Sequence, residues 1–347
     1  MVAAHMREFP LRTAPGLAVA MPAVALGTWK LSPDDAFEVV TSALDAGYRH
    51  LDCAPVYKNQ SAIGAALGWW LTTNEGKAHR KDLFITSKIM PSKDLLPGNY
   101  EGDVRKTLSE LNVPYLDLCL LHWPLEFGHS TLEDMWSAME SLVREGLCRA
   151  VGVSNFSVKK LARILETAEI PVSVNQIELH AMFRQDMLVK YCQSNGVHVT
   201  SYGPLGSFDQ WDEKGLGRKC PEPVRLIDHP DAKRVAEAAG CTPAQALLAW
   251  IVLRRGCSCA PKTVRKERMA ENLAVGSNKF LSDHPAKRAA LVQLDNVEPQ
   301  VRLQHGSFHT GPVESGKAYR TLAELWDEDC VYYDGRDFET PAGFVLR

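Results

Sequence analysis

Four side chains that can hold or move a proton follow apolar segments at regular intervals in this sequence. They are Asp52, Tyr57, Lys88 and His122. Lys88 lies 36 residues after Asp52, and His122 lies 34 residues after Lys88, which is close to the roughly 30 residues of a strand–helix–strand unit. A tyrosine beside a lysine, an aspartate and a histidine is an acid–base set that contains no obvious metal site. This combination suits the delivery of a proton to a carbonyl oxygen.

We expect Tyr57 to be the general acid of this set. An unperturbed phenol has a pKa of about 10, too high for easy proton donation at neutral pH. A nearby ammonium lowers that pKa, so we expect Lys88 to activate Tyr57 and Asp52 to hold Lys88 in place. His122 would orient the carbonyl oxygen or share the proton transfer. Taken singly, these residues could be a core ion pair and a loop aromatic, but their joint spacing favours function.

Apolar runs that resemble strands alternate with amphipathic stretches, as is typical of a parallel sheet with crossover helices. The runs lie at 24–29, 48–52, 83–88, 115–122, 148–155, 172–176, 197–206 and 257–262. The expected helices lie at 34–47, 60–72, 100–112, 132–145, 157–167, 184–195, 231–250 and 266–275. Eight such units close a barrel, and the ends of its strands converge on one face, where active sites are built. The sequence therefore predicts an α/β fold, a single (β/α)8 TIM barrel spanning residues 1–347.

Three segments lie outside this repeating pattern. Residues 10–22 read as a short hairpin that could cover the bottom of the barrel. Residues 206–230 form a long loop after the seventh strand, rich in glycine, proline and charge. Residues 297–347 are a polar tail with little periodicity. Long segments without regular structure in a compact domain are often functional.

Composition narrows the class of protein further. The chain has 347 residues, of which 45% are hydrophobic and 23% charged, and a formal net charge of −3. This balance is ordinary for a soluble globular protein and argues against a general nucleic-acid or anionic-membrane binder. The sequence contains no run of 18 apolar residues, so it predicts no membrane span. Its start is charged and interrupted by prolines, unlike a secretory leader. We therefore expect a cytoplasmic protein.

The cysteines do not predict a disulfide framework or a metal site. There are nine, an odd and scattered number, and several fall inside the expected strands. Reduced thiols are the expected state in the cytosol. Cys257 and Cys259 could be read as half of a metal site, but no second pair of matching spacing accompanies them. We expect no metal.

Several motifs together resemble the aldo-keto reductases, in order and at the spacing of that family from about residue 16 to 275. They are GTWK (27–30), GYRHLDCAPVY (47–57), LFITSK (83–88), LLHWP (120–124), GVSNF (152–156), NQIELH (175–180), YGPLGS (202–207) and PKTVRKERMAEN (261–272). The resemblance implies a monomeric barrel that reduces aldehydes and ketones, aldoses among the candidates, with a nicotinamide dinucleotide held without a Rossmann domain. In the family tetrad, Asp52, Tyr57, Lys88 and His122 would take the roles given above.

The resemblance also implies a set of residues that hold the cofactor. Ser154, Asn155 and Gln176 would bind the nicotinamide carboxamide, and Tyr202 would stack on the ring, as suits a flat aromatic side chain. Leu205 and Ser207 match the pyrophosphate loop, and Thr28 of the first motif belongs with the cofactor residues. Ser154 and Asn155 could also cap the helix that follows them, and the two roles are compatible.

The last motif predicts which dinucleotide is used. By the resemblance, the 2′-phosphate of NADPH would lie against Lys262, Thr263, Arg268, Glu271 and Asn272. A guanidinium and an ammonium that face one pocket fit a phosphate dianion, so we expect NADP(H) rather than NAD(H). Arg265 stands where a small polar residue is frequent in the family, and it would add a phosphate contact or be solvated.

The residues expected to line the substrate side of the pocket say less about function than those expected to hold the cofactor. Trp29, Met90 and Trp123, together with His122, would line it, and Met90 stands where many relatives carry an aromatic residue. By the resemblance, the tail at 297–347 would lie over the barrel mouth and set substrate selectivity, but it carries no clear motif. The physiological carbonyl compound is therefore left open. Two other functions also remain open at this stage. One is a Schiff-base lyase that uses Lys88 as nucleophile, and the other is a barrel that binds a nucleotide as a redox sensor without turnover.

Overall fold

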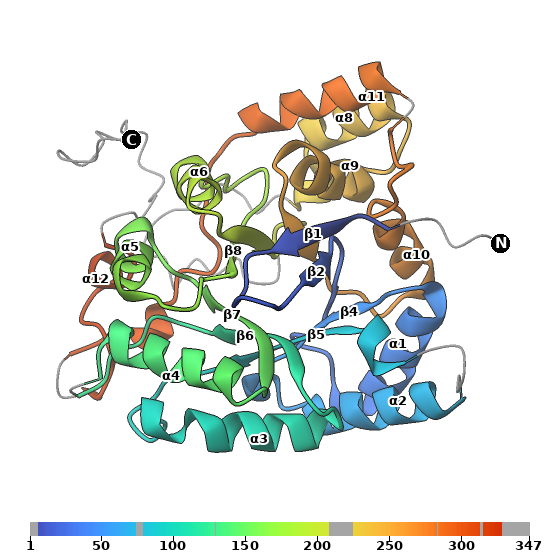
Figure 1. Cartoon of the computed structure of the whole chain (residues 1–347). Coiled ribbons are helices and arrows are strands. Elements are labelled where there is room, and N and C mark those ends of the chain that lie inside the picture. Colours follow the sequence, from blue (N-terminus) through green and yellow to red (C-terminus); the bar gives the residue numbers. More distant parts are fainter. Residues whose placement is uncertain are drawn as a thin grey trace.

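Eight parallel strands form the centre of the molecule. The computed structural model describes residues 6–73, 79–128, 130–207, 225–282, 284–312 and 315–327. Each strand is hydrogen-bonded to the next in chain order (Figure 1). The strands are β3 (Leu26–Gly27), β4 (His50–Asp52), β5 (Phe84–Ile89), β6 (Leu116–Leu121), β7 (Cys148–Ser154), β8 (Val174–Glu178), β9 (His198–Tyr202) and β10 (Ser258–Ala260). The predicted (β/α)8 architecture is confirmed.

The first and last strands meet and close the barrel. Val24 and Cys259 form a parallel bridge beside β3, and the backbone N–H of Gly27 donates to the carbonyl oxygen of Pro261 over 3.0 Å. A Cβ atom on Gly27 would lie 2.7 Å from the carbonyl oxygen of Ala260. Only a glycine allows the backbones to approach this closely, which explains its position at the seam.

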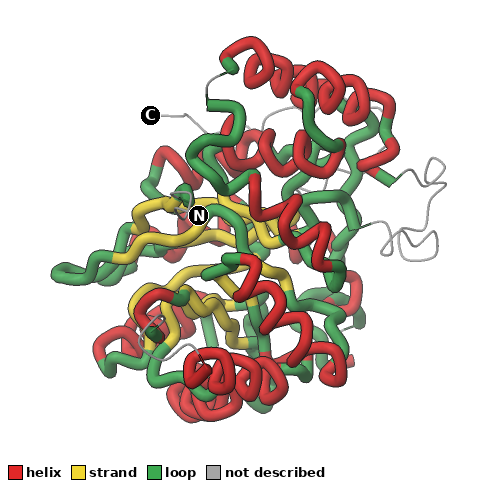
Figure 2. The backbone as a smooth tube through the Cα atoms, turned by 90° about the vertical axis from the view of Figure 1, so that its right-hand side faces the viewer, coloured by secondary structure: helices red, strands yellow, loops and turns green. Residues whose placement is uncertain are grey.

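Helices surround the strands on the outside (Figure 2). They are α1 (Pro33–Ala46), α2 (Gln60–Thr73), α3 (Tyr100–Leu111), α4 (Leu132–Arg144), α5 (Val158–Thr167), α6 (Asp186–Ser194), α8 (Pro230–Ala239), α9 (Pro243–Ala249), α10 (Lys266–Ala274), α11 (Pro285–Ala290) and α12 (Leu322–Trp326). The start of α1 shows how local residues define these boundaries. Ser32 accepts the backbone N–H of Asp35, and Gly47, with φ of 107°, ends the helix.

The expectation of one helix over 231–250 is wrong. Gly240 adopts φ of 68° and ends α8, and Thr242 caps a new helix that has Pro243 in its first turn. The chain bends by 85° at this break and continues past α9 as a π-helical turn over Trp250–Arg254. The apolar pattern runs on across the break, which is why periodicity alone does not reveal it.

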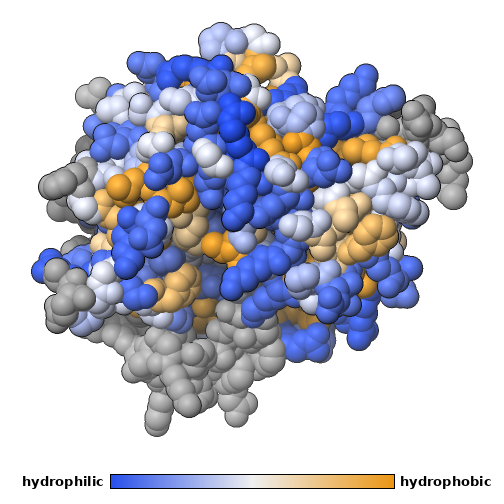
Figure 3. Space-filling view, turned by 90° about the horizontal axis from the view of Figure 1, so that it is seen from below, coloured by the Kyte–Doolittle hydropathy of each residue, from blue (hydrophilic) through white to orange (hydrophobic). Residues whose placement is uncertain are grey.

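No single helix in the described ranges is long and apolar enough to cross a membrane, although the bent pair 230–239 and 243–254 passes on length and composition alone. In the space-filling view from below, hydrophilic side chains dominate the visible face and apolar ones form separate small groups (Figure 3).

A hairpin closes the bottom of the barrel, as predicted. β1 (Glu8–Leu11) pairs in antiparallel fashion with β2 (Val19–Pro22). Its buried side chains pack on residues near the N-terminal ends of the strands and inside the barrel, in one apolar cluster that contains Leu11, Val19, Met21, Phe84, Leu118, Leu120, Ala150 and Val174. The opposite end of the barrel, where the strands finish, is left for the site.

The other two irregular segments are described in part. Residues 208–224 of the long loop after β9 and residues 328–347 of the tail lie outside the described residues. Residues 225–230 lead into α8 through a short 3-10 turn over Leu226–Asp228. The tail from residue 297 contains little regular structure before α12 and crosses the barrel mouth, where Gln304 and Phe308 reach the central pocket.

Candidate active site

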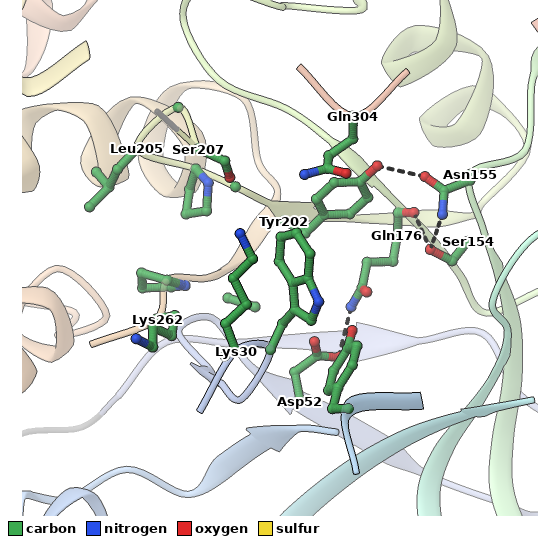
Figure 4. A pocket seen from close by; sticks show the side chains of 18 of the residues that line it. Lys30, Asp52, Ser154, Asn155, Gln176, Tyr202, Leu205, Ser207, Lys262 and Gln304 are labelled. Carbon is green, nitrogen blue, oxygen red and sulfur yellow. Dashed lines mark hydrogen bonds between the residues drawn. The ribbon is translucent and has the colours of Figure 1, made fainter. Parts of the chain in front are cut away.

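The strand ends surround one pocket at the mouth of the barrel. It has a volume of about 650 Å³. Its walls include Trp29, Asp52, Tyr57, Met90, His122, Trp123, Ser154, Asn155, Gln176, Tyr202, Leu205, Ser207, Lys262 and Arg268. All of these were predicted from the sequence as site residues, and Figure 4 shows how several of them face one another. The barrel thus brings together residues from most of the chain.

The four predicted proton-handling residues lie next to one another. Asp52 ends β4, Tyr57 ends the 3-10 turn Pro55–Tyr57 that follows it, Lys88 lies in β5, and His122 follows β6 directly. The buried ammonium of Lys88 donates to Asp52 Oδ1 over 2.9 Å and to Tyr57 Oη over 3.3 Å. A third bond, of 3.0 Å, goes to the carbonyl oxygen of Cys53. Every proton of the ammonium is therefore directed at an acceptor.

Asp52, which neutralises the Lys88 ammonium, is also fixed by several hydrogen bonds. Its Oδ1 also accepts a hydrogen bond of 2.9 Å from the side-chain amide of Gln176, which reaches across from β8. Thr28 donates its hydroxyl to the carbonyl oxygen of Asp52 over 2.7 Å. Thr28 is buried and does not belong to the pocket wall, so it touches the site through the backbone of Asp52.

The acidity of Tyr57 differs from the sequence expectation. Burial raises the pKa of its phenol, Lys88 lowers it, and the net result is a pKa of about 12. Lys88 acts in the expected direction, but the loss of hydration is the larger effect. Tyr57 therefore carries its proton at neutral pH. Because Lys88 donates to the phenol oxygen, the phenol directs its own proton elsewhere, and the pocket lies on that side.

The ammonium of Lys88 is charged in this setting. Burial opposes the charge, but the neighbouring Asp52 carboxylate and Tyr57 phenol raise the pKa of Lys88 above its ordinary value. An ion pair in a dry environment is strong only when its partners are this well bonded. Lys88 is consequently a fixed positive charge beside the phenol.

His122 lies on the other side of the phenol and is neutral. Its ring meets the ring of Tyr57 edge-to-face, with centroids 5.9 Å apart. Burial, then the positive charge of Lys88 and the nearby His309, hold the pKa of His122 well below its usual range. A neutral imidazole has one N–H to donate. Tyr57 and His122 together can therefore present two hydrogen-bond donors to one oxygen atom.

A hydrogen-bonded chain of polar side chains forms the opposite wall. The Tyr202 hydroxyl donates to Asn155 Oδ1 over 2.6 Å, and Asn155 Nδ2 donates to the His122 carbonyl oxygen over 2.9 Å. Ser154 donates to the carbonyl oxygen of Gln176 over 2.8 Å. These bonds, drawn in part in Figure 4, fix the Tyr202 ring as one flat side of the pocket.

Asn155 shows how the backbone serves this wall. It adopts φ of 64° directly after β7, a left-handed conformation that asparagine tolerates better than most residues. Both ends of its side-chain amide are used, toward Tyr202 and toward His122. Ser157, two residues further on, accepts the backbone N–H of Lys160 and caps α5. The helix cap expected as the alternative role of Ser154 and Asn155 is thus supplied by Ser157.

Four cations line the pocket: Lys30, Arg225, Lys262 and Arg268. Lys30 lies over the Trp29 ring, 4.6 Å from its centroid. Lys262 and Arg268 are exposed. Within the described ranges no carboxylate lies within ion-pair distance of Lys262 or Arg268. The glycines of the loop after β9 allow it to turn tightly here, because Gly203 and Gly206 adopt φ of 57° and 66°. Leu205 and Ser207 of this loop line the pocket.

Three other predicted cofactor residues do not reach the pocket wall. Thr263 is buried and accepts the backbone N–H of Arg265 over 3.1 Å, at the start of α10. Glu271 contacts the cap of α9, where Thr242 donates to its carboxylate. Asn272 is buried in α10. Of the three α10 residues expected against the 2′-phosphate, Arg268, Glu271 and Asn272, only Arg268 therefore lines the pocket.

Sequence reasoning missed several lining residues. They are Lys30, Val56, Arg225, Ile227, Gln304 and Phe308. Lys30 and Val56 belong to the motifs GTWK and GYRHLDCAPVY, next to the predicted site residues Trp29 and Tyr57. Their positions in these motifs could have indicated that they line the pocket. Arg225 and Ile227 come from the long loop after β9, and Gln304 and Phe308 come from the tail. No local pattern marks those four.

Trp123 connects the site to the tail. It is buried, and its ring lies 5.6 Å from that of Phe308 and 5.7 Å from that of Trp326, in both cases edge-to-face. With Leu125 and Leu325 it forms a small apolar cluster separate from the main core. The tail therefore forms part of the pocket wall beside Trp123.

No group of three or more histidine, cysteine, aspartate or glutamate side chains among the described residues is placed to hold a metal ion. The seven cysteines in the described ranges are free thiols. Cys220 and Cys330 lie outside these ranges.

Comparisons with known proteins identify the family of this chain. Residues 23–291 match the model of the aldo/keto reductase family. The chain belongs to this family. It is 39% identical over 339 residues to an aldo/keto reductase of Synechocystis sp., covering 93% of this chain and 97% of the relative. It is also 39% identical over 302 residues to aldo-keto reductase family 1 member A1 of Sus scrofa, covering 82% and 88%.

Solved structures agree on the fold. The aldose reductase of Schistosoma japonicum superposes with a TM-score of 0.70 at 34% identity, covering 84% of this chain and 94% of that one. The aldose reductase of Giardia lamblia superposes with a TM-score of 0.69 at 33% identity, covering 81% and 94%. As a member of the aldo/keto reductases, this chain is an oxidoreductase of carbonyl compounds.

Proposed function

We propose that this aldo/keto reductase uses NADPH to reduce aldehydes and ketones, with Tyr57 as the general acid. The observation that supports this most directly is the position of Tyr57, whose phenol accepts a hydrogen bond from the buried Lys88 ammonium and faces the pocket. A protonated phenol with a fixed cation behind it can give up its proton to an oxygen that is becoming negative.

The steps that this chain's residues perform follow from the geometry. When bound, the nicotinamide supplies the hydride that goes to the carbonyl carbon. Tyr57 and His122 donate hydrogen bonds to the carbonyl oxygen, and Tyr57 transfers its proton as charge develops there. Lys88 then stabilises the phenolate until solvent returns a proton. Asp52 keeps the Lys88 ammonium in place and balances its charge.

The pocket fits an elongated cofactor with a flat ring at one end and phosphates at the other. Tyr202 offers an aromatic face near Tyr57, and the cationic residues lie at the far end. We assign Ser154, Asn155 and Gln176 to the carboxamide, and Leu205 and Ser207 to the pyrophosphate. Lys262 and Arg268 would bind the 2′-phosphate. We assign only indirect roles to Thr28, Thr263, Glu271 and Asn272. Thr28 is bonded to the backbone of Asp52, and the other three belong to the segment that carries Arg268.

The substrate side suits an apolar or aromatic carbonyl compound. Trp29, Val56, Met90, Trp123 and Phe308 line this part of the pocket. Apolar walls with a few convergent polar groups are typical of sites for small molecules. We therefore propose that Trp29, Met90 and Trp123 contact the substrate, while His122 contacts its oxygen.

The geometry does not favour the Schiff-base alternative. A nucleophilic lysine must lose its proton and reach the substrate, whereas Lys88 is buried, donates three hydrogen bonds and has a raised pKa. Lys88 would have to break its contact with Asp52 in order to react.

The proposal is tested by following NADPH oxidation at pH 7 with a panel of aldoses, aliphatic and aromatic aldehydes, quinones and keto-steroids. We expect turnover with at least the aromatic aldehydes. Tight NADPH binding without turnover of any member would favour a redox sensor, and a borohydride-trapped adduct on Lys88 would favour the lyase.

Assembly as a monomer in the cytoplasm stays a prediction from the sequence. Light scattering coupled to size-exclusion chromatography would test the monomer, with an expected mass of 38.5 kDa.

A further inference from the structure

A second buried carboxylate lies at the mouth of the barrel and has no part in the mechanism above. Glu178 ends β8, and only 2% of its surface is exposed. It pairs in register with Tyr202, the last residue of β9. Burying a carboxylate is costly unless it is fully hydrogen-bonded, so its partners indicate what it does.

The partners of Glu178 come mainly from the C-terminal tail. One carboxylate oxygen accepts the backbone N–H of Leu303 and the other accepts that of Gln304, both over 2.8 Å. His180 Nε2 lies 3.0 Å from the first oxygen. Burial alone would raise the pKa of Glu178, but the bond from His180, the charge of Arg302 and the Gln304 N–H outweigh it and lower the pKa. An ionised carboxylate thus holds two successive backbone groups of the tail.

The residues that Glu178 holds lead directly into the pocket wall. Gln304 lies beside Tyr202 at the edge of the pocket (Figure 4), and its amide nitrogen is buried with no hydrogen-bond partner among the described residues. Phe308, four residues later, packs against Trp123 and lines the substrate side. Displacement of the backbone at 303–304 would therefore move both Gln304 and Phe308.

The tail is also held on either side of the Glu178 contact. Just before it, the backbone N–H of Val301 donates to the carbonyl oxygen of Met182 over 2.6 Å. At the end of its described residues, Asp327 accepts a hydrogen bond of 2.7 Å from the Lys160 ammonium. Between these points the tail packs on Trp123, and its described regular structure consists of the 3-10 turn Ser307–His309 and α12. Glu178 is thus the anchor that bonds directly to the backbone of Leu303 and Gln304, where the tail enters the pocket wall.

We propose that Glu178 is a positioning residue that fixes the tail as one wall of the substrate pocket, and that it controls substrate KM and selectivity but not cofactor binding or proton transfer. This inference rests on the proposed carbonyl reduction. The carboxylate offers two acceptors to two adjacent N–H groups, a match that an amide of the same size lacks, because its NH2 end would face an N–H.

The experiment compares the full-length E178Q protein with wild type and with a matched control, E140Q. Glu140 of α4 is also buried and also accepts two successive backbone N–H groups, those of Glu169 and Ile170, over 2.7 and 2.9 Å. It lies outside the pocket wall. Both bonds end on the same oxygen, Oε1, so a glutamine can keep them. The control therefore removes a buried carboxylate charge without releasing a backbone anchor or moving the tail.

We expect E178Q to raise the KM for an aromatic aldehyde about tenfold and that for propanal less than about threefold, since the small substrate does not need the tail. The Kd for NADPH and the kcat with propanal should stay within about twofold of wild type. E140Q should leave both KM values unchanged. Equal KM changes in the two variants, or none in E178Q, would refute the proposal.

Hydrogen exchange gives a readout that does not depend on turnover. In E178Q, the peptide that contains Leu303 and Gln304 should exchange about tenfold faster than in wild type, while peptides from β4 to β6 keep their protection. If E178Q does not fold, E178D replaces it, because it keeps the charge but shortens the reach. Wild-type exchange and KM in E178D would overturn the proposal. If wild type reduces no carbonyl, the proposed function fails, and the exchange experiment still decides the role of Glu178.

Discussion

The Lys88 ammonium lies 3.3 Å from the phenol oxygen of Tyr57 and 2.9 Å from Asp52 Oδ1. This arrangement keeps a positive charge behind the phenol without using the phenol's own proton. Burial raises the pKa of the phenol, and this effect is larger than the lowering by Lys88. In the proposed reaction, the phenol would therefore donate its proton only when negative charge forms in front of it.

Replacement of Tyr57 by phenylalanine removes the proposed proton donor and changes little else. We expect kcat to fall about 10²- to 10⁴-fold, the range that positioned acid–base groups contribute, while the Kd for NADPH changes less than about twofold. Stopped-flow absorbance and fluorescence titration measure the two quantities. Turnover close to that of wild type would remove Tyr57 from the mechanism.

Replacement of Lys88 by methionine leaves the buried Asp52 without its cation. We expect the free energy of unfolding to fall by about 3–5 kcal/mol, as when one partner of a buried ion pair is removed. The double variant D52N/K88M should recover part of this loss, because no uncompensated charge remains. Urea denaturation measures both. If the double variant loses more unfolding free energy than the sum of the losses in D52N and K88M, the charges do not couple these two positions.

Replacement of Arg268 by alanine removes one of the cations at the far end of the pocket. We expect the Kd for NADPH to rise about 10- to 100-fold, as for loss of a charge-assisted bond, and the Kd for NADH to change little. Arg265→Ala is the matched control, since Arg265 begins the same helix but does not line the pocket. Equal losses for both dinucleotides would show that Arg268 does not recognise the 2′-phosphate.

Stability should decline in mild acid because of two histidines near the bottom of the barrel. Burial lowers the pKa of His50 to about 4 and that of His198 to about 3. Below the unfolded-state pKa of about 6.5 the unfolded chain binds more protons than the folded one, so stability rises with pH in this window. Each histidine contributes a slope of up to about 1.4 kcal/mol per pH unit between pH 6 and its folded pKa.

The histidine prediction is checked by urea unfolding of wild type and of His50→Asn between pH 4.5 and 7.5. Other buried histidines with lowered pKa values, such as His309, add to the wild-type slope in the same direction. The difference between the two proteins reports on His50. Its removal should lower the slope of the unfolding free energy against pH by up to about 1.4 kcal/mol per pH unit. Identical slopes in the two proteins would show that His50 does not titrate on unfolding.

Local sequence patterns were sufficient to predict the barrel and which residues meet at its mouth. Strand and helix periods are properties of neighbouring residues, and eight alternating units are typical of a closed barrel. Asp52, Lys88 and His122 each stand at or near a strand end, so the architecture itself brings them together. The break at Gly240–Thr242 was missed because the apolar pattern continues through it, although the glycine and the following Thr-Pro pair were visible signals.

Contacts between distant segments required the tertiary structure. The tail was expected over the barrel mouth, but no pattern around residue 304 or 308 indicates that these residues line the pocket. Their neighbour Leu303 bonds to Glu178, 125 residues earlier in the chain. The pKa of Tyr57 likewise depends on how completely the fold removes water, which neither Tyr57 nor Lys88 reveals by its identity. The sequence by itself determined the residue types and their order along the strands. Only the folded chain decided which of them lose their hydration and which residues of the tail reach the pocket.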